Sequence, residues 1–171
     1  FSTKAIEVLA SHGFDLTFLE SSHRGENLSS AFANWHGDYI LCFRSLYILT
    51  KEDLARARVA TINFHPGPPE RRGTGCLNYA LYHNDVMYGV TAHLVNEEID
   101  SGDILVCKRF PINDSDTVET LLLRTHQHLF ESFIEVVRGV AGAGREFLDR
   151  AKVECLAHKW RGRVLTEKDL E

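Results

Sequence analysis

The sequence predicts an α/β fold with a mostly parallel, twisted sheet flanked by helices. Short apolar runs of the buried-strand type, such as residues 38–43 and 59–64, alternate with segments whose apolar residues recur at helical spacing. Chains with this alternation usually join parallel strands by right-handed helical crossovers. The length of 171 residues is enough for one domain with a complete hydrophobic core.

The first third of the chain is expected to start with a helix over residues 2–13, because apolar residues recur there at helical spacing and a glycine ends the run. Residues 14–19 are typical of a strand. A helix as the first element of such a fold also implies a preceding strand, so we expect the fold to be incomplete at its N-terminus. Three further elements are expected here: a helix over 27–35, a strand over 38–43 and a helix from Thr50 to Arg56.

The rest of the chain alternates around one irregular loop, residues 66–75, which holds three of the four prolines and three glycines. We place a catalytic domain over residues 1–150 and a short C-terminal extension over residues 151–171. The elements expected around the loop are a strand over 59–64, a helix over 76–83, strands over 86–95 and 104–110, a long helix from Asp116 to Gly139 and a small hairpin around Gly162.

The composition excludes several classes of protein. There are 19 basic against 24 acidic residues, a formal net charge of -5, whereas a nucleic-acid-binding surface needs the opposite balance. No stretch approaches the ~20 apolar residues of a membrane span. The four cysteines are scattered, which is typical of reduced thiols in the cytoplasm, and no histidines show ligand spacing. We therefore expect a cytoplasmic protein without a metal site, nucleic-acid partner or membrane contact.

Two polar side chains end the strand before the loop. Asn63 and His65 are two residues apart, so they point to the same side of the strand. They also lie at its carboxyl end, where open α/β sheets place their ligands. An Asn amide is a fixed donor to an oxyanion, and a His passes protons near neutral pH. Such a pair is structural about as often as functional, so both interpretations stay open.

A second polar segment separates the two strands that follow. Glu97 and Glu98 fit a solvated turn, whereas Asp100 is followed by Ser and Gly in a tight turn that can aim its carboxylate. A carboxylate beside an imidazole fixes the orientation of the ring and stabilises its charged form. His93 alternates with apolar residues, so a core role and a catalytic role both stay open. We expect Trp160 to anchor the C-terminal segment by packing.

The order of these motifs resembles the folate-dependent formyltransferases, a family that includes glycinamide ribonucleotide transformylase and methionyl-tRNA formyltransferase. The resemblance runs from about Asp38 to Val137 and implies a Rossmann-like formyltransferase fold. The motifs that carry it are Asn63-x-His65-Pro66, the Gly73/Gly75 loop, Gly89-Val90-Thr91-x-His93 and Ile99-Asp100-x-Gly102-x-Ile104. Within the family, the segment from His65 to Glu70 is most similar to the N-formyltransferases of nucleotide-linked amino sugars.

The resemblance also implies an activity and a set of site residues. It implies formyl transfer from the co-substrate 10-formyltetrahydrofolate to a primary amine of a small molecule. The amine expected first is that of a nucleotide-linked amino sugar. The catalytic residues that the resemblance implies are Asn63, His65 and Asp100. The residues expected to bind folate are Ser45, Leu46, Tyr47, Ile48, Leu49, Glu97, Glu98 and Ile99. The residues expected to bind the substrate are Pro68, Pro69, Glu70, Arg71, Arg72 and Gly73.

Several alternatives stay open. Arg71 and Arg72 either clamp a diphosphate, because guanidinium groups match phosphate oxygens, or are solvated loop charges. The substrate is alternatively the glycinamide ribonucleotide of purine synthesis or methionyl-tRNA, although the acidic balance opposes tRNA. A non-catalytic module that binds folate or a nucleotide sugar is the alternative of a different class. Whether the protein forms a homodimer is also left open.

Overall fold

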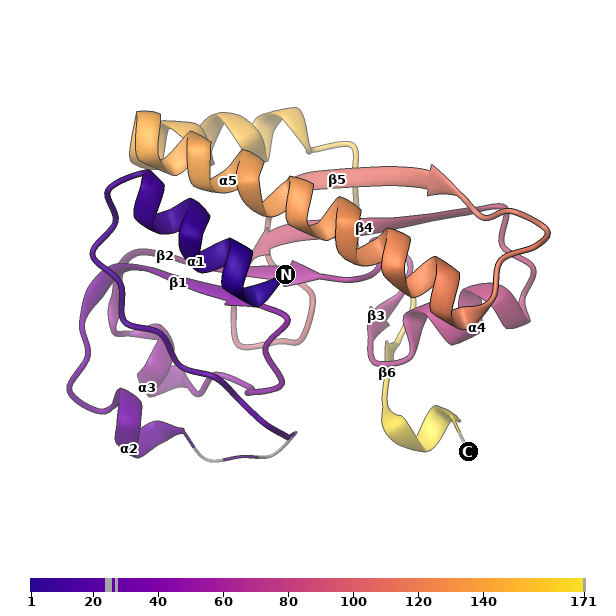
Figure 1. Cartoon of the computed structure of the whole chain (residues 1–171), viewed down its shortest axis with the longest axis horizontal. Helices are drawn as coiled ribbons and strands as arrows, with labels where there is room; N and C mark the ends of the chain where they lie inside the picture. Colours follow the sequence, from indigo (N-terminus) through magenta and orange to yellow (C-terminus); the bar gives the residue numbers. More distant parts are fainter. Residues whose placement is uncertain (24–25, 27, 171) are drawn as a thin grey trace.

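The computed structural model describes residues 1–23, 26 and 28–170 of the chain. A four-stranded sheet forms its centre, with α5 (Val118–Glu154) lying along three of the strands and α1 (Ser2–Ser11) beside α5 (Figure 1). This architecture confirms the α/β class and the flanking helices. In order across the sheet, the strands are β1 (Gly37–Phe43), β2 (Ala57–His65), β4 (Met87–Leu94) and β5 (Ile104–Pro111).

The smaller elements connect the strands and close the ends of the molecule. Thr50 caps α3 through a capping box, in which its side chain accepts from the Asp53 N–H. These elements are α2 (Ser29–Phe32), α3 (Lys51–Leu54), β3 (Arg72–Gly73), α4 (Cys76–Tyr82), β6 (Val164–Leu165) and a 3₁₀ turn over Glu167–Leu170.

The hydrophobic core lies between α5 and the sheet. The apolar face of α5 recurs at helical spacing and is almost fully buried against β2 and β4. Each such side chain contributes roughly 1.5–3 kcal/mol when it leaves water. The buried residues of this interface are Leu121, Leu129, Phe133, Val136 and Val137 from α5, Ile62 and Phe64 from β2, and Val90 and Ala92 from β4. The core therefore fixes the two strands that carry the polar motifs.

The sheet is mixed, so the expectation of a mostly parallel sheet is wrong in this respect. β1 and β2 are parallel, whereas β2 with β4 and β4 with β5 are antiparallel. For β4 and β5 the reason lies in the connection over residues 95–103, which is too short for a crossover of a dozen or more residues. β4 and β5 therefore form a hairpin, and its turn comes back to the end of β2.

Two expectations about the first third of the chain also change. Residues 14–19 form no strand, because Phe14 uses its ring for packing, edge-on to Tyr39 at 6.4 Å, while Phe18 is 53% exposed. The helix expected over 27–35 is limited to α2, and Asn27 lies outside the described residues. The strand expected before residue 1 stays a prediction.

The helix expected to end at Gly139 continues to Glu154 with a sharp turn at Gly144, where φ is 53° and ψ is -126°. The second arm returns to the first, since a Cβ on Gly139 would lie 2.3 Å from the Phe147 ring. Residues eight apart in a straight helix would be about 12 Å apart. Gly139 is therefore a packing position. Residue 150 lies inside the second arm, so the division into 1–150 and 151–171 stays a prediction.

The C-terminal segment does not form the hairpin expected around Gly162. Instead β6 pairs in parallel with β3, with Arg72 opposite Val164 and Gly73 opposite Leu165. Two short strands that are far apart in sequence stabilise each other by pairing, and local sequence signals do not encode such a pairing. None of the helices in the described ranges is long and apolar enough to cross a membrane.

Candidate active site

The pairing of β2 with β4 brings two polar side chains together. The register places Asn63 opposite His93 and His65 opposite Thr91. Side chains at opposed positions of neighbouring strands share one face and lie close together. Accordingly, Asn63 Nδ2 lies 3.2 Å from His93 Nε2. His93 thus lies beside the predicted catalytic residues, and a catalytic role for it stays a prediction.

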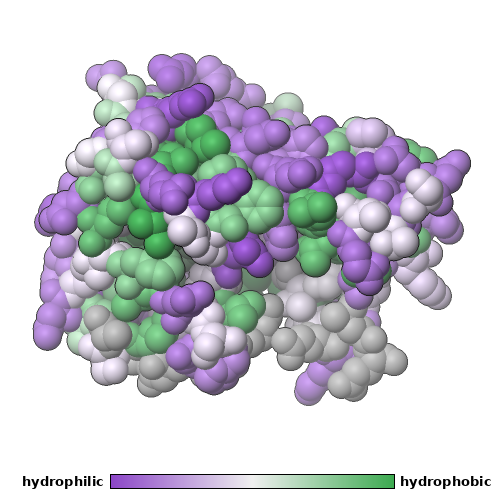
Figure 2. Space-filling model, in the orientation of Figure 1, coloured by the Kyte–Doolittle hydropathy of each residue, from purple (hydrophilic) through white to green (hydrophobic). Residues whose placement is uncertain are grey.

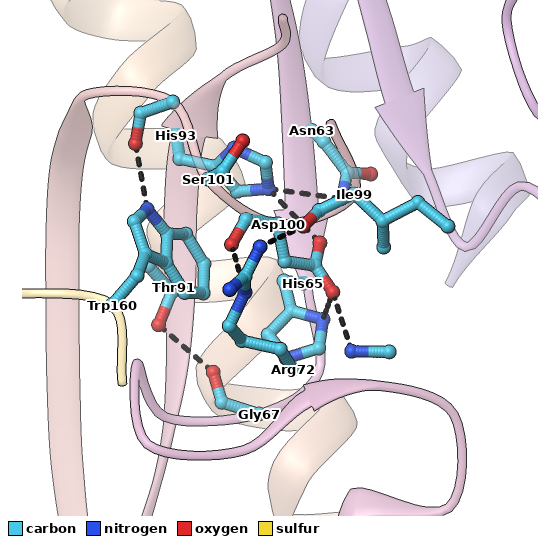
Figure 3. A network of polar contacts seen from close by, with 12 residues as sticks. Asn63, His65, Gly67, Arg72, Thr91, His93, Ile99, Asp100, Ser101 and Trp160 are labelled. Carbon is cyan, nitrogen blue, oxygen red and sulfur yellow. Dashed lines mark hydrogen bonds and ion pairs between the residues drawn. The ribbon is translucent and has the colours of Figure 1, made fainter. Parts of the chain in front are cut away.

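The turn between β4 and β5 adds a carboxylate. Asp100 has a φ of 45°, a left-handed conformation that Asp and Asn adopt more readily than most residues. Its Oδ2 lies 3.3 Å from His65 Nδ1, and its Oδ1 lies 3.3 Å from His93 Nε2. Figure 3 shows that the side chains of Asn63, His65, His93 and Asp100 point toward one another. We call these four residues the catalytic cluster, after the role predicted for Asn63, His65 and Asp100, which stays a prediction.

Both imidazole rings of the catalytic cluster have acceptors on two sides. His65 Nε2 lies 2.6 Å from the Arg71 carbonyl oxygen, and His93 Nδ1 lies 2.8 Å from the Leu94 carbonyl oxygen. The second nitrogen of each ring faces Asp100. A neutral imidazole has a single N–H, so it donates to only one of its two acceptors. Taking up a proton would let His65 donate both to the Arg71 carbonyl and to Asp100, so the cluster has a place for one more proton.

Burial sets the charges within the cluster. His65 is 3% exposed and Asp100 is 6% exposed. Burial lowers the pKa of His65, although the nearby Asp100 carboxylate opposes this effect. Burial would raise the pKa of Asp100, but His65, His93 and the Gly73 N–H, which donates at 2.7 Å, together lower that pKa to about 2. At neutral pH the cluster therefore holds an ionised Asp100 beside a largely neutral His65.

Side chains of β4 hold the loop that follows β2 in place. The Tyr88 hydroxyl donates to the Pro66 carbonyl at 2.9 Å, and the Thr91 hydroxyl donates to the Gly67 carbonyl at 2.8 Å. Gly67 leaves room for the His65 ring, because a Cβ there would lie 2.5 Å from His65 Nε2. The loop therefore holds His65 from one side while β2 holds it from the other.

The two arginines of this loop point at partners within the protein. Arg72 Nε donates to the Asp100 carbonyl and a terminal Arg72 nitrogen donates to the Ile99 carbonyl, both at 2.7 Å. Arg71 donates twice to Asp85 Oδ2, at 3.2 and 2.7 Å. Both guanidinium groups thus have protein partners, so the interpretation as solvated loop charges is wrong. Arg72 clamps the turn that carries Asp100.

The remaining residues predicted to bind the substrate also contact other parts of the protein. Pro68 and Pro69 are buried, and Glu70 Oε1 accepts from a terminal nitrogen of Arg109 at 2.7 Å. Gly73 has a φ of 84° and lies against β6, where a Cβ would come within 2.2 Å of the Leu165 carbonyl oxygen. A substrate-binding role stays a prediction for Pro68, Pro69, Glu70, Arg71, Arg72 and Gly73.

The first predicted folate loop is fixed by a buried carboxylate. Asp53, which is 1% exposed, accepts from the Tyr47 hydroxyl at 2.7 Å. Burial and the neighbouring Asp53 raise the pKa of Tyr47 to about 12. Leu46 and Ile48 remain exposed. Of the predicted residues, Ser45, Leu46, Tyr47 and Leu49 line a cavity of about 800 Å³.

This cavity lies in the half of the molecule that holds α1, α2 and α3, where apolar side chains gather on the surface (Figure 2). The second predicted folate loop contacts α3, which follows the first loop, through an exposed ion pair of 2.9 Å between Lys51 and Glu97. Within that loop, Asn96 Oδ1 accepts from the Glu98 N–H, and the Ile99 side chain is exposed. Both loops offer exposed apolar side chains that suit a flat ring, namely Leu46, Ile48 and Ile99; folate binding stays a prediction.

Sequence reasoning left His93 open because its partners come from distant positions. The signal that would have found it is the matching two-residue spacing in Asn63-x-His65 and Thr91-x-His93, which an antiparallel register brings face to face. Among the described residues, no group of three or more His, Cys, Asp or Glu side chains is arranged to hold a metal ion.

Several known proteins are similar to this chain in sequence. Methionyl-tRNA formyltransferase of Ehrlichia ruminantium is 41% identical over 75 residues, which are 43% of this chain and 25% of that protein. Phosphoribosylglycinamide formyltransferase of Haemophilus influenzae is 29% identical over 102 residues, 59% of this chain and 48% of that protein. The chain thus spans about a quarter to a half of these two relatives.

Solved structures resemble the fold as well. The formyltransferase PseJ from Anoxybacillus kamchatkensis, in complex with UDP-4,6-dideoxy-4-formamido-L-AltNAc and tetrahydrofolate, has a TM-score of 0.68 at 21% identity, covering 84% of this chain and 73% of that chain. Phosphoribosylglycinamide formyltransferase from Coxiella burnetii has a TM-score of 0.56 at 28% identity, covering 61% and 49%. The family model described as formyl transferase matches residues 3–137. Since this match covers most of the chain and includes the whole catalytic cluster, the chain belongs to the formyl transferase family.

Proposed function

We propose that this chain transfers the formyl group of 10-formyltetrahydrofolate to a primary amine of a small molecule. The observation that carries the proposal is the buried Asp100 carboxylate, which lies between His65 and His93 while Asn63 faces His93 (Figure 3). This arrangement combines an amide donor with groups that accept a proton, which is what acyl transfer to an amine requires.

Asn63 has the role of stabilising negative charge. When the amine attacks the formyl carbon, the formyl oxygen becomes negatively charged. The Asn63 amide carries two N–H donors, and its contact with His93 occupies at most one of them. Removing one such donor from an oxyanion typically lowers turnover by ~10²–10³.

His65 and Asp100 have the role of holding a proton. The attacking nitrogen must lose a proton, and the nitrogen of the departing tetrahydrofolate must gain one. A neutral His65 leaves one of its two acceptors unsatisfied, so the cluster accepts the proton and returns it to the leaving nitrogen, through water where the distance demands it. His93 orients Asp100 and Asn63 from the opposite strand.

The co-substrate is proposed to lie between the two loops beside this cluster. Ser45, Leu46, Tyr47, Ile48 and Leu49 would contact the pterin through backbone groups and apolar side chains, and Glu97, Glu98 and Ile99 would close over its other side. The ion pair between Lys51 and Glu97 supports this placement, because it brings the second loop against α3, which directly follows the first loop.

For the amine we propose a nucleotide-linked amino sugar. The proline-rich segment from Pro66 to Glu70 supports this class by its resemblance to enzymes of such substrates, and the formamido sugar bound to PseJ is a chemical guide to a first candidate. The net charge of -5 argues against the phosphate backbone of tRNA. Glycinamide ribonucleotide is the second candidate, because two purine-pathway relatives are 28% and 29% identical.

The test combines an amine panel with one isosteric substitution. The protein is incubated with 10-formyltetrahydrofolate and UDP- or dTDP-linked 4-amino sugars, glycinamide ribonucleotide or methionyl-tRNA, and formylated product is measured. Asp100→Asn keeps the left-handed backbone, which Asn adopts readily, and removes the charge. We expect a fall in turnover of at least ~10²-fold with little change in folate affinity.

Asp103→Asn is the matched control, since Asp103 is exposed and lies three residues away. It should leave turnover unchanged. Turnover of Asp100→Asn within about threefold of the wild type would return Asp100 to a structural role. Folate binding without formylation of any amine would support the binding-module alternative instead.

A further inference from the structure

The C-terminal segment, residues 158–166, lies across the catalytic cluster. Trp160 Nε1 donates to the carbonyl of Gly102 at 2.7 Å, two residues after Asp100 (Figure 3). The Trp160 ring lies edge-on to His93, with ring centroids 4.9 Å apart and an interplanar angle of 82°. It also meets His65, with centroids 5.9 Å apart. One side chain thus contacts both histidines and the turn that carries the carboxylate.

The backbone of the same segment fixes the donors that hold Asp100. The Arg161 N–H donates to the Pro69 carbonyl at 3.0 Å, and β6 pairs with β3. β3 carries Arg72, which clamps the backbone of the turn, and Gly73, whose N–H donates to the Asp100 carboxylate. The segment therefore supports the turn directly through Trp160 and indirectly through β3.

The turn needs such support because its backbone is unusual. Asp100 lies at a φ of 45°, and a non-glycine residue stays in that region only where its surroundings determine it. Gly102 is packed so closely that a Cβ would lie 1.9 Å from the Leu94 carbonyl oxygen. A small shift of this turn would change the distances from Asp100 to both imidazole rings.

We infer that Trp160 is a positioning residue of the transfer reaction. It holds the Asp100 turn in place and keeps the His93 ring directed toward Asn63. This inference rests on the proposed function of the catalytic cluster. Trp160 acts through its neighbours, because its N–H is used by Gly102 and its ring edge lies on the histidines. The C-terminal segment is thereby part of the site, beyond the packing anchor expected from sequence.

Two substitutions separate the roles of the N–H and the ring. Trp160→Phe keeps an aromatic ring and removes the donor, so we expect kcat to fall about tenfold while KM for 10-formyltetrahydrofolate changes less than twofold. Trp160→Ala also removes the ring, and we expect a fall of about a hundredfold, as for a misplacement of about 1 Å. Circular dichroism and thermal unfolding show whether each variant is folded. The control is Tyr82→Ala, because Tyr82 is 80% exposed and its ring contacts His83 and not the cluster; its turnover should equal that of the wild type.

A second readout does not depend on activity. The groups that face His65 are Asp100, His93, Arg72, the Arg71 carbonyl and the Cys76 thiol. Trp160→Ala would admit water to this ring, so the pKa of His65, measured by NMR titration of its ring nitrogens, should rise toward its ordinary value. In Tyr82→Ala it should stay at the wild-type value.

The two readouts separate the outcomes. A folded Trp160→Ala protein with turnover within about threefold of the wild type and an unchanged His65 titration would overturn the inference. If the wild-type protein formylated no amine, the proposed function would fail, and the His65 titration would still decide whether Trp160 positions the cluster: a shifted titration supports it and an unshifted one overturns it.

Discussion

Gly67 lies directly against the ring of His65: a Cβ at this position would come within 2.5 Å of Nε2 and 3.2 Å of Cδ2. The ring has little freedom to move away, because Nε2 is bound to the Arg71 carbonyl at 2.6 Å. We predict that Gly67→Ala displaces the imidazole and lowers turnover by about a hundredfold. Overpacking should also lower the free energy of unfolding by about 1–3 kcal/mol. Steady-state kinetics and urea unfolding measure the two effects.

Gly142→Ala is the control for this substitution. Gly142 lies in the first arm of α5, and nothing lies within 4 Å of the position that its Cβ would take. Alanine is favoured over glycine in a helix by about 1 kcal/mol, so this variant should be at least as stable as the wild type and equally active. Full activity of Gly67→Ala would show that the His65 ring tolerates displacement.

The position of Asn63 and His65 at the end of β2 was predictable because its signals are local. The apolar run of residues 59–64, the two-residue spacing of Asn63 and His65 and the proline that follows specify a strand, a common face and an end. The capping of α3 by Thr50 is local in the same way. These features survive in the structure because tertiary packing reinforces them.

The remaining features depend on contacts between distant parts of the chain. The place of His93 follows from the antiparallel register of β4 on β2, and the sharp turn of α5 at Gly144 follows from the packing of its second arm on the first. Trp160 reaches Gly102 only because β6 pairs with β3. No local pattern encodes these pairings, which is why the sequence left His93 open and predicted a separate hairpin at the C-terminus.

The pH dependence of transfer should show two separate causes. Burial lowers the pKa of His65. The neutral ring, which accepts the proton, therefore persists at pH values below the ordinary histidine pKa of about 6.5. Activity is therefore lost in acid as His65 gains a proton, and between about pH 6 and 8 it should rise as the substrate amine loses one. Profiles of kcat/KM with two amines of different pKa measure this: the upper limb should move with the amine and the lower limb should stay. A flat profile from about pH 5 to 9 would contradict this assignment.

The hydroxyl of Tyr47 should matter for folate binding and not for chemistry. It donates to Asp53 at 2.7 Å, and this contact fixes the backbone of the first folate loop. Tyr47→Phe should raise KM for 10-formyltetrahydrofolate about three- to tenfold and leave kcat unchanged. Asp53 Oδ2 keeps the Thr50 N–H and hydroxyl as donors, so the loss of this one hydrogen bond should lower the free energy of unfolding by only about 1 kcal/mol. The control is Tyr82→Phe, because Tyr82 is 80% exposed; a Tyr47→Phe protein with an unchanged KM would remove this loop from the folate site.

The two roles considered for Arg72 make opposite kinetic predictions. In the structure its fork donates to the carbonyls of Ile99 and Asp100, so it clamps the catalytic turn. Lysine keeps the charge and loses the fork, so Arg72→Lys should lower kcat about tenfold for every amine, including amines without a phosphate group. A diphosphate clamp would instead raise KM for nucleotide-linked amines alone.

Arg150→Lys is the control for the charge-preserving change, because Arg150 is exposed and pairs with Glu154 in the second arm of α5. Its kinetic constants should match those of the wild type. If Arg72→Lys raised only KM for nucleotide-linked substrates, Arg72 would leave the clamp during binding and contact the diphosphate. If kcat fell equally for all amines, the guanidinium would act on Asp100 through the turn, because only the shared catalytic step would then be affected.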